Sequence, residues 1–123
     1  GSPKMNFLII RTVTPQGDAL LLALPGAGAV ALPRRGEGAP AVLGVRPEHL
    51  TIVAADAPDA LHGTVLVTEA LGSETLLHID LAGQTIIVKQ EGTAPFSRGD
   101  TVALCVPKDA CHLFDANGLA LAF

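Results

Sequence analysis

The chain has 123 residues, which is the usual size of one domain and enough to bury an apolar core without disulfides or metals. Its formal net charge of −4 provides no basic surface for nucleic acid, so we expect no nucleic-acid partner. Two cysteines are too few for a secreted disulfide framework, and the apolar runs are far shorter than the ~18 residues that cross a bilayer. We therefore expect a cytoplasmic domain without direct membrane insertion.

Short aliphatic runs are separated by glycine and proline at intervals of roughly 8–12 residues, a spacing that is typical of an all-β protein. The sequence predicts strands at 6–13, 19–24, 28–32, 42–46, 51–54, 63–70, 75–81, 84–89, 101–106, 111–114 and 119–123. Helix should be scarce. Many short strands joined by turns favour a small barrel or a sandwich over an open sheet.

Alternation is clearest in the segment 75–89. Leu77 and Ile79 fall on one face of the expected strand, whereas His78 falls on the other, as a half-buried strand requires. A turn at 82–83 then makes the segment a hairpin, and the Asn-Gly pair at 117–118 is the strongest hairpin signal in the chain. The pattern is weakest at 27–41, where we expect one strand and an exposed loop around 34–38.

Catalytic and metal-binding signatures are missing. The sequence has no glycine-rich phosphate loop ending in Lys-Ser or Lys-Thr and no G-x-S-x-G nucleophile motif. The four histidines and two cysteines match no zinc spacing, and the acid pairs Asp56 with Asp59 and Glu69 with Glu74 lie in or beside expected turns. We therefore expect no enzyme activity, no catalytic residue, no cofactor and no metal in this chain.

The most conspicuous charged motif is "GVRPEHL" at 44–50, whose candidate residues are Arg46, Pro47, Glu48 and His49. Because a residue before proline is held extended, Arg46 should end a strand and Pro47 should begin a single turn, after which Leu50 returns to the core. We expect Arg46 to pair with a carboxylate on a neighbouring strand. A structural turn is the favoured interpretation, a contact site for another domain is the alternative, and catalysis comes third.

Five motifs occur in order along nearly the whole chain: "GSPKMNFL", "GVRPEHL", "LGSETLLHI", "RGD" and "CHLFD". This series resembles the C-terminal regulatory region of the ATP-binding subunit of carbohydrate-type ABC importers, the maltose and sn-glycerol-3-phosphate transporter group. The resemblance implies one transport-associated OB (TOBE) domain over 1–123, with an entry segment at 1–8 and an exposed loop region at 27–41. We expect its OB-type barrel to comprise mainly 63–123 together with the strand 42–46.

The resemblance also implies a role. Such a domain is noncatalytic, regulates the transporter and dimerises, while ATP and magnesium belong to an ATPase domain that is not present in this chain. Its implied partners are a second copy, that ATPase domain, membrane permease subunits and a regulatory protein or small effector. The implied location is cytoplasmic and peripheral to the inner membrane. The alternative is a small-ligand or oxyanion-binding OB module of a related ABC transporter ATPase.

Overall fold

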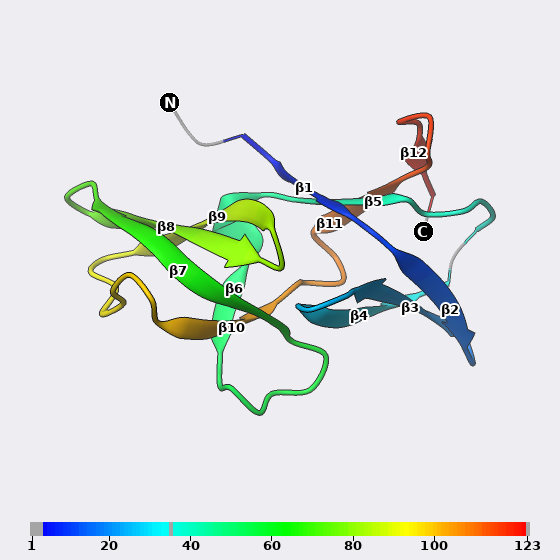
Figure 1. The fold of residues 1–123 in the computed structure, drawn as a ribbon. Coiled ribbons are helices and arrows are strands. Elements are labelled where there is room, and N and C mark those ends of the chain that lie inside the picture. The colour runs from blue at the N-terminus through cyan, green and yellow to red at the C-terminus, as the bar shows by residue number, and fades with distance from the viewer. Residues whose placement is uncertain (1–3, 35, 123) are drawn as a thin grey trace.

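The structure, a computed structural model, describes residues 4–34 and 36–122, and most of these lie in β-strands (Figure 1). The strands are β1 Asn6–Ile9, β2 Thr12–Gln16, β3 Ala19–Leu24, β4 Gly28–Pro33, β5 Val42–Val45, β6 Thr51–Val53, β7 Leu61–Ala70, β8 Glu74–Leu81, β9 Gln84–Glu91, β10 Thr101–Cys105, β11 Cys111–Phe114 and β12 Ala120–Leu121. Within the described residues the one helical element is the 3-10 turn η1, Pro47–His49. The prediction of an all-β, OB-type fold with little helix is confirmed.

The strands form two antiparallel sheets. One has the order β1-β5-β11-β12, and the other has the order β2-β3-β4-β7-β10-β6, with β8 paired to β7 and β9 paired to β8. Figure 1 shows the first sheet in the upper part of the view, and the β7–β8–β9 meander on the left. The expected composition of the barrel was incomplete: β5 pairs with β11, which lies within 63–123, but also with β1, and β7 and β10 share a sheet with β2–β4.

The expected single strand 6–13 is in fact two strands in different sheets. The break falls where the chain changes its hydrogen-bond partner: the Ile10 amide donates to the Ala41 carbonyl at 2.9 Å, and the Arg11 amide donates to the Ala23 carbonyl at 3.0 Å. Buried and exposed residues alternate through β1, whereas β2 has no buried residue and only Val13 is half-buried.

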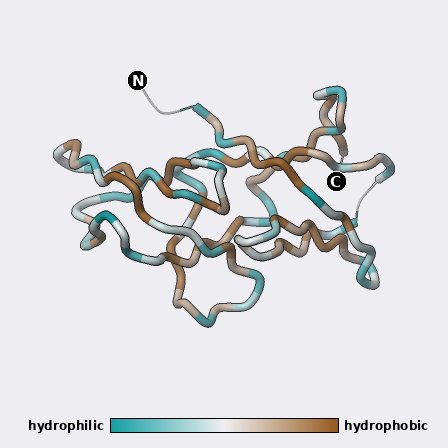
Figure 2. The backbone as a smooth tube through the Cα atoms, in the orientation of Figure 1, coloured by the Kyte–Doolittle hydropathy of each residue, from teal (hydrophilic) through white to brown (hydrophobic). Residues whose placement is uncertain are grey.

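The inner faces of both sheets form one aliphatic core. In the first sheet Leu8, Leu43 and Leu113 lie side by side and are at most 2% exposed. The buried faces of β8 and β9, which include Leu77, Ile79 and Val88, belong to the same cluster. Figure 2 shows hydrophobic residues along the strands and hydrophilic residues at most of the turns. The predicted alternation of 75–89 is confirmed.

Two side-chain amides join β1 to β9, whose other edge pairs with β8. Asn6 donates from Nδ2 to the Ile87 carbonyl and accepts at Oδ1 from the Ile87 amide, both at 2.8 Å. Gln84 makes the same pair of bonds to the backbone of Ile9: its Oε1 accepts from the Ile9 amide at 2.8 Å, and its Nε2 donates to the Ile9 carbonyl at 3.3 Å. Each side-chain amide thus makes the two hydrogen bonds that the backbone of a paired strand would make. Together the two amides connect the two sheets at this edge.

The β8–β9 turn contains a strained residue. Ala82 has φ of +50° and Gly83 has φ of +94°, which is the left-handed pair that a two-residue hairpin turn requires. Glycine adopts this backbone readily, whereas alanine does so at a cost of roughly 1–2 kcal/mol.

We expect Ala82→Asn to stabilise the domain by about 0.5–1 kcal/mol, because asparagine tolerates the left-handed conformation and Asn-Gly is the preferred turn pair. Urea denaturation monitored by circular dichroism measures the change. Ala116→Asn, an exposed substitution in another turn, is the matched control and should change the stability little. A loss of stability in Ala82→Asn would contradict the assignment of strain to this residue.

Candidate inter-domain contact site

The charged segment 46–49 forms one 3-10 turn directly after β5. Arg46 has the extended backbone that a following proline favours, with φ of −73° and ψ of 146°, and Pro47 begins the turn. The His49 amide donates to the Arg46 carbonyl at 3.0 Å. Pro47 and Leu50 are buried, whereas Arg46, Glu48 and His49 are exposed. The prediction of a proline-anchored turn is confirmed, and the turn leaves three polar side chains on the surface.

The turn η1 packs against β9 and places Glu48 near a second carboxylate and a lysine. Lys89 Nζ lies 2.8 Å from Glu74 Oε2. This hydrogen bond raises the pKa of Lys89, and the negative charge of Glu48 acts in the same direction. A shallow groove of about 300 Å³ runs along this contact and is lined by Glu48, Leu50, Thr51, Lys89, Gln90 and Glu91. The surface here is polar and of mixed charge.

Arg46 does not make the ion pair that we expected. Within residues 4–34 and 36–122 the ion pairs are Lys89 with Glu74 and His78 with Glu69. Arg46 is exposed at the end of β5 and is in neither of these pairs. In these pairs Glu69 contacts His78 and Glu74 contacts Lys89, so each carboxylate lies beside a basic side chain.

An apolar surface lies on the outer face of the first sheet. Phe7 is 59% exposed and Ile9 is 48% exposed, and both point away from the core because Leu8 between them is buried. The strand register places Gly44 beside Phe7 and places Val42 between Ile9 and Phe114. The rings of Phe7 and Phe114 meet edge to face with their centroids 5.8 Å apart. We call the surface formed by Met5, Phe7, Ile9, Val42 and Phe114 the Phe7 patch.

Gly44, the first residue of the "GVRPEHL" motif, lies beneath this patch. A Cβ atom at this position would come within 2.8 Å of the Met5 sulfur and 3.0 Å of the Phe114 ring. The absence of a side chain therefore lets the aromatic rings and the methionine close over the strand. The motif therefore includes a glycine that the patch requires and, three residues later, the proline that begins the turn.

Thiols and imidazoles are not assembled into a metal centre. Among the described residues no three His, Cys, Asp or Glu side chains are grouped so that they could hold a metal ion. Cys105 and Cys111 are free thiols, and burial raises the pKa of Cys111 to about 11. In the part of the chain that the structure describes, no helix has the length and apolarity needed to span a bilayer.

Sequence reasoning did not identify Asn6 or Gln84 as structural residues, nor the Phe7 patch. One signal was available in the sequence for Asn6, because it is a polar residue inside the apolar run 5–10. In the structure it is only 8% exposed. No local signal marks Gln84, which lies just after a turn where polar residues are common. The patch depends on which strands are neighbours, and alternation alone does not determine this.

Family models match both halves of the chain. The model described as TOBE domain matches residues 43–114, and the model described as MalK OB fold domain matches residues 1–50. Since the first match covers more than half of the sequence, the chain belongs to the TOBE domain family. This confirms the resemblance inferred from the five motifs.

The relatives are named as ATP-binding proteins of import or transport. The chain is 35% identical over 126 residues to "Maltose/maltodextrin import ATP-binding protein MalK" of Yersinia pestis, which covers 98% of this chain and 34% of that protein. It is 42% identical over 125 residues to "Alpha-glucoside transport ATP-binding protein AglK" of Rhizobium meliloti, covering 96% of this chain and 34% of the relative. The chain thus spans about a third of the length of these curated relatives.

A solved structure shares the fold. The cytoplasmic molybdate-binding protein ModG, in a crystal form with molybdate bound, superposes with a TM-score of 0.64 and 14% sequence identity over 96% of each chain. At this level of identity the similarity concerns the fold alone.

Proposed function

We propose that this chain is the noncatalytic regulatory and dimerisation domain of the ATP-binding subunit of an ABC importer for sugars or sugar-like solutes. The match to the TOBE and MalK OB fold models supports the assignment, as do relatives that are named for maltose/maltodextrin import and for alpha-glucoside transport. Because the chain spans about a third of those relatives, we assign ATP and magnesium binding, and hydrolysis, to the remainder of the parent subunit.

The parent subunit would lie on the cytoplasmic face of the inner membrane, bound to permease subunits. Within this assembly we assign the exposed side chains of Arg46, Glu48 and His49 to contacts with the ATPase domain or with a regulatory protein or small effector. Two observations support a contact role over catalysis. The three side chains are exposed on a rigid proline-anchored turn, and the groove beside them carries both signs of charge.

The Phe7 patch is the observation that carries the dimerisation role. Two of its members, Phe7 and Ile9, are about half exposed, although they stand on a strand whose other face is in the core. Only 16% of the residues are charged, below the ~25% that is typical of soluble domains. Exposed apolar surfaces that extend over several strands commonly mark protein interfaces. A second copy of the same patch provides a complementary apolar surface, as twofold dimers require.

We expect the isolated chain to form a homodimer through the Phe7 patch. Sedimentation equilibrium over a concentration series should show the mass rising from 12.6 kDa toward twice that value. Phe7→Ser removes the largest exposed apolar side chain of the patch and should raise the dissociation constant by about tenfold or more, because aromatic side chains at the centre of interfaces contribute most of the binding energy.

Leu119→Ser is the matched control, since Leu119 is 65% exposed, lies on the β11–β12 loop and is not part of the patch. Its dissociation constant should equal that of the unchanged chain. A strictly monomeric mass at several hundred micromolar would contradict dimerisation through this domain. Equal dissociation constants for Phe7→Ser and Leu119→Ser would contradict the position of the interface.

A further inference from the structure

Met5 is the only methionine of the chain, and it lies in the Phe7 patch with its side chain half-buried. Its sulfur, Cε2 of Phe114 and Cε1 of Phe7 all lie within 3.5 Å of the point that a Cβ atom on Gly44 would occupy. The sulfur is therefore at the place where the two rings meet. Contacts between a thioether sulfur and aromatic rings are favourable, so Met5 helps to hold the patch together.

The surroundings of this sulfur favour a thioether over its oxidised form. The other side chains of the patch are aromatic or aliphatic and carry no hydrogen-bond donor: Phe7, Ile9, Val42 and Phe114. A sulfoxide has a polar oxygen that needs a donor, and within the patch only water can supply one. Oxidation of the sulfur should therefore turn the Met5 side chain toward solvent and break its contact with the rings.

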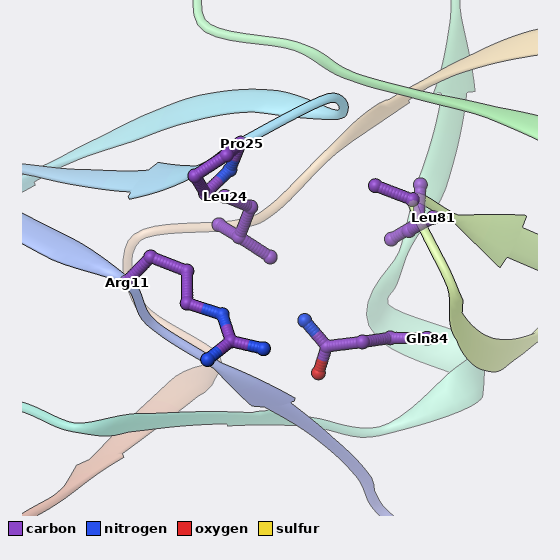
Figure 3. A pocket seen from close by; sticks show the side chains of 6 residues that line it. Arg11, Leu24, Pro25, Leu81 and Gln84 are labelled. Carbon is purple, nitrogen blue, oxygen red and sulfur yellow. The ribbon is translucent and has the colours of Figure 1, made fainter.

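The strand β1, which follows Met5, is held by contacts that do not involve the Met5 side chain. It pairs with β5 along its whole length, and the side-chain amides of Asn6 and Gln84 bond it to β9. Gln84 also lines a pocket of about 320 Å³ together with Arg11, and Figure 3 shows its head group pointing toward that residue. A change at Met5 should therefore alter the patch and leave the fold intact.

We propose that Met5 is a reversible oxidation site whose sulfoxide opens the Phe7 patch and weakens the dimer formed through it. The statement about the dimer rests on the proposed function, whereas oxidation and the opening of the patch do not. In the reaction with hydrogen peroxide the sulfur attacks one peroxide oxygen and the O–O bond breaks. Hydroxide leaves and takes the proton of the transferred oxygen, so the products are the sulfoxide and water. The sulfur loses two electrons, which the peroxide gains, and methionine sulfoxide reductases reverse the change.

Oxidation and dimerisation should oppose each other. The dimer covers the patch, so peroxide should react with the sulfur of the dissociated chain. The sulfoxide then opposes reassociation, because an acceptor that is buried without a donor is costly. We expect oxidation of Met5 to raise the dissociation constant of the dimer by about tenfold or more.

Treatment of the isotope-labelled chain with hydrogen peroxide tests the proposal. Peptide mass spectrometry should locate one added oxygen on Met5, and sedimentation equilibrium should show the weaker dimer. The ring resonances of Phe7 and Phe114 should shift in NMR spectra, whereas those of Phe96, which is not part of the patch, should stay unchanged. Methionine sulfoxide reductases of both stereospecificities should restore the dissociation constant and the resonances.

Met5→Leu is the matched control, because leucine is apolar and similar in volume but has no sulfur. Peroxide should leave its dissociation constant unchanged, and any effect of oxidation at the free thiols Cys105 and Cys111 would appear in this variant as well. Met5→Gln, which places a polar side chain in the patch permanently, should weaken the dimer without peroxide.

The two measurements separate this proposal from the proposed function. If the untreated chain stays monomeric, dimerisation through this domain fails, and the ring resonances alone decide whether oxidation opens the patch. The absence of a sulfoxide at Met5, or ring resonances that do not move when the sulfoxide forms, would overturn the proposal. So would equal effects of peroxide on the unchanged chain and on Met5→Leu, or an unchanged dissociation constant in a chain that does dimerise.

Discussion

Gly63→Ala is expected to destabilise the domain by about 3 kcal/mol, at the upper end of the usual cost of overpacking a core. A Cβ atom on Gly63 would lie 2.6 Å from Ile79 Cγ2, 2.7 Å from the Asp80 carbonyl oxygen and 2.7 Å from Leu81 Cδ2. One of these neighbours is backbone and the other two side chains are completely buried, so none of them can move away without disturbing the β7–β8 pair.

Urea denaturation of the purified variants measures this effect. Thr64→Ala is the matched control, because Thr64 is the next residue of β7, is exposed and contributes no core contact. It should cost less than about 1 kcal/mol, the range of strand propensity at such sites. Equal costs for the two variants would show that the close approach of β7 to β8 at Gly63 is not a constraint on stability.

Asn6→Ala should cost about 2–4 kcal/mol, since it leaves both the amide and the carbonyl of Ile87 without partners in a partly buried position. Gln84→Ala removes an amide that makes the same pair of bonds to Ile9, but in an exposed position where water replaces them. It should therefore cost about 1 kcal/mol or less. Similar costs for the two variants would contradict the role of burial in making the Asn6 bonds important.

The stability of the Asn6→Asp variant should depend on pH. The introduced carboxylate still accepts from the Ile87 amide, but in its charged form it repels the Ile87 carbonyl, to which Asn6 donates. Folding therefore raises the pKa of this carboxyl above its unfolded value of about 4. Relative to the unchanged chain, the variant should be least destabilised below that value and increasingly destabilised as the pH rises to 7. A penalty that is constant with pH would contradict this geometry.

Much of the secondary structure was predictable from local pattern. The hairpin of β8 and β9 follows from alternation and from the turn at 82–83, and the segment 19–24 coincides with β3. The turn at Asp115–Leu119 also follows from its residue types, since Asp115 Oδ1 accepts from the amides of Asn117 and Leu119. These features depend on residues a few positions apart, which is the range over which sequence patterns are informative.

The arrangement of the strands was not predictable in the same way. The division of 6–13 between two sheets depends on Ala41 and Ala23 as partners, and neither lies near it in the sequence. The motif at 46–49 was located correctly as a turn, but the exposure of Arg46 depends on which carboxylates the fold brings near it. The Phe7 patch and the pocket at Arg11 likewise exist because separate segments converge, so local residue types do not mark them.

Asn6 and its bonding partner are far apart in the sequence, which bears on the order in which we expect the domain to fold. Asn6 and Ile87 are 81 residues apart in the chain, whereas β7, β8 and β9 are successive strands joined by short turns. Closing a long loop costs more entropy than closing a short one, so local hairpins form before contacts that span the chain. We therefore expect the meander to assemble early and the N-terminal strand to dock late. During synthesis, β1 leaves the ribosome before the other strands of this domain, but it remains without its β9 partner until more than two thirds of the domain has followed.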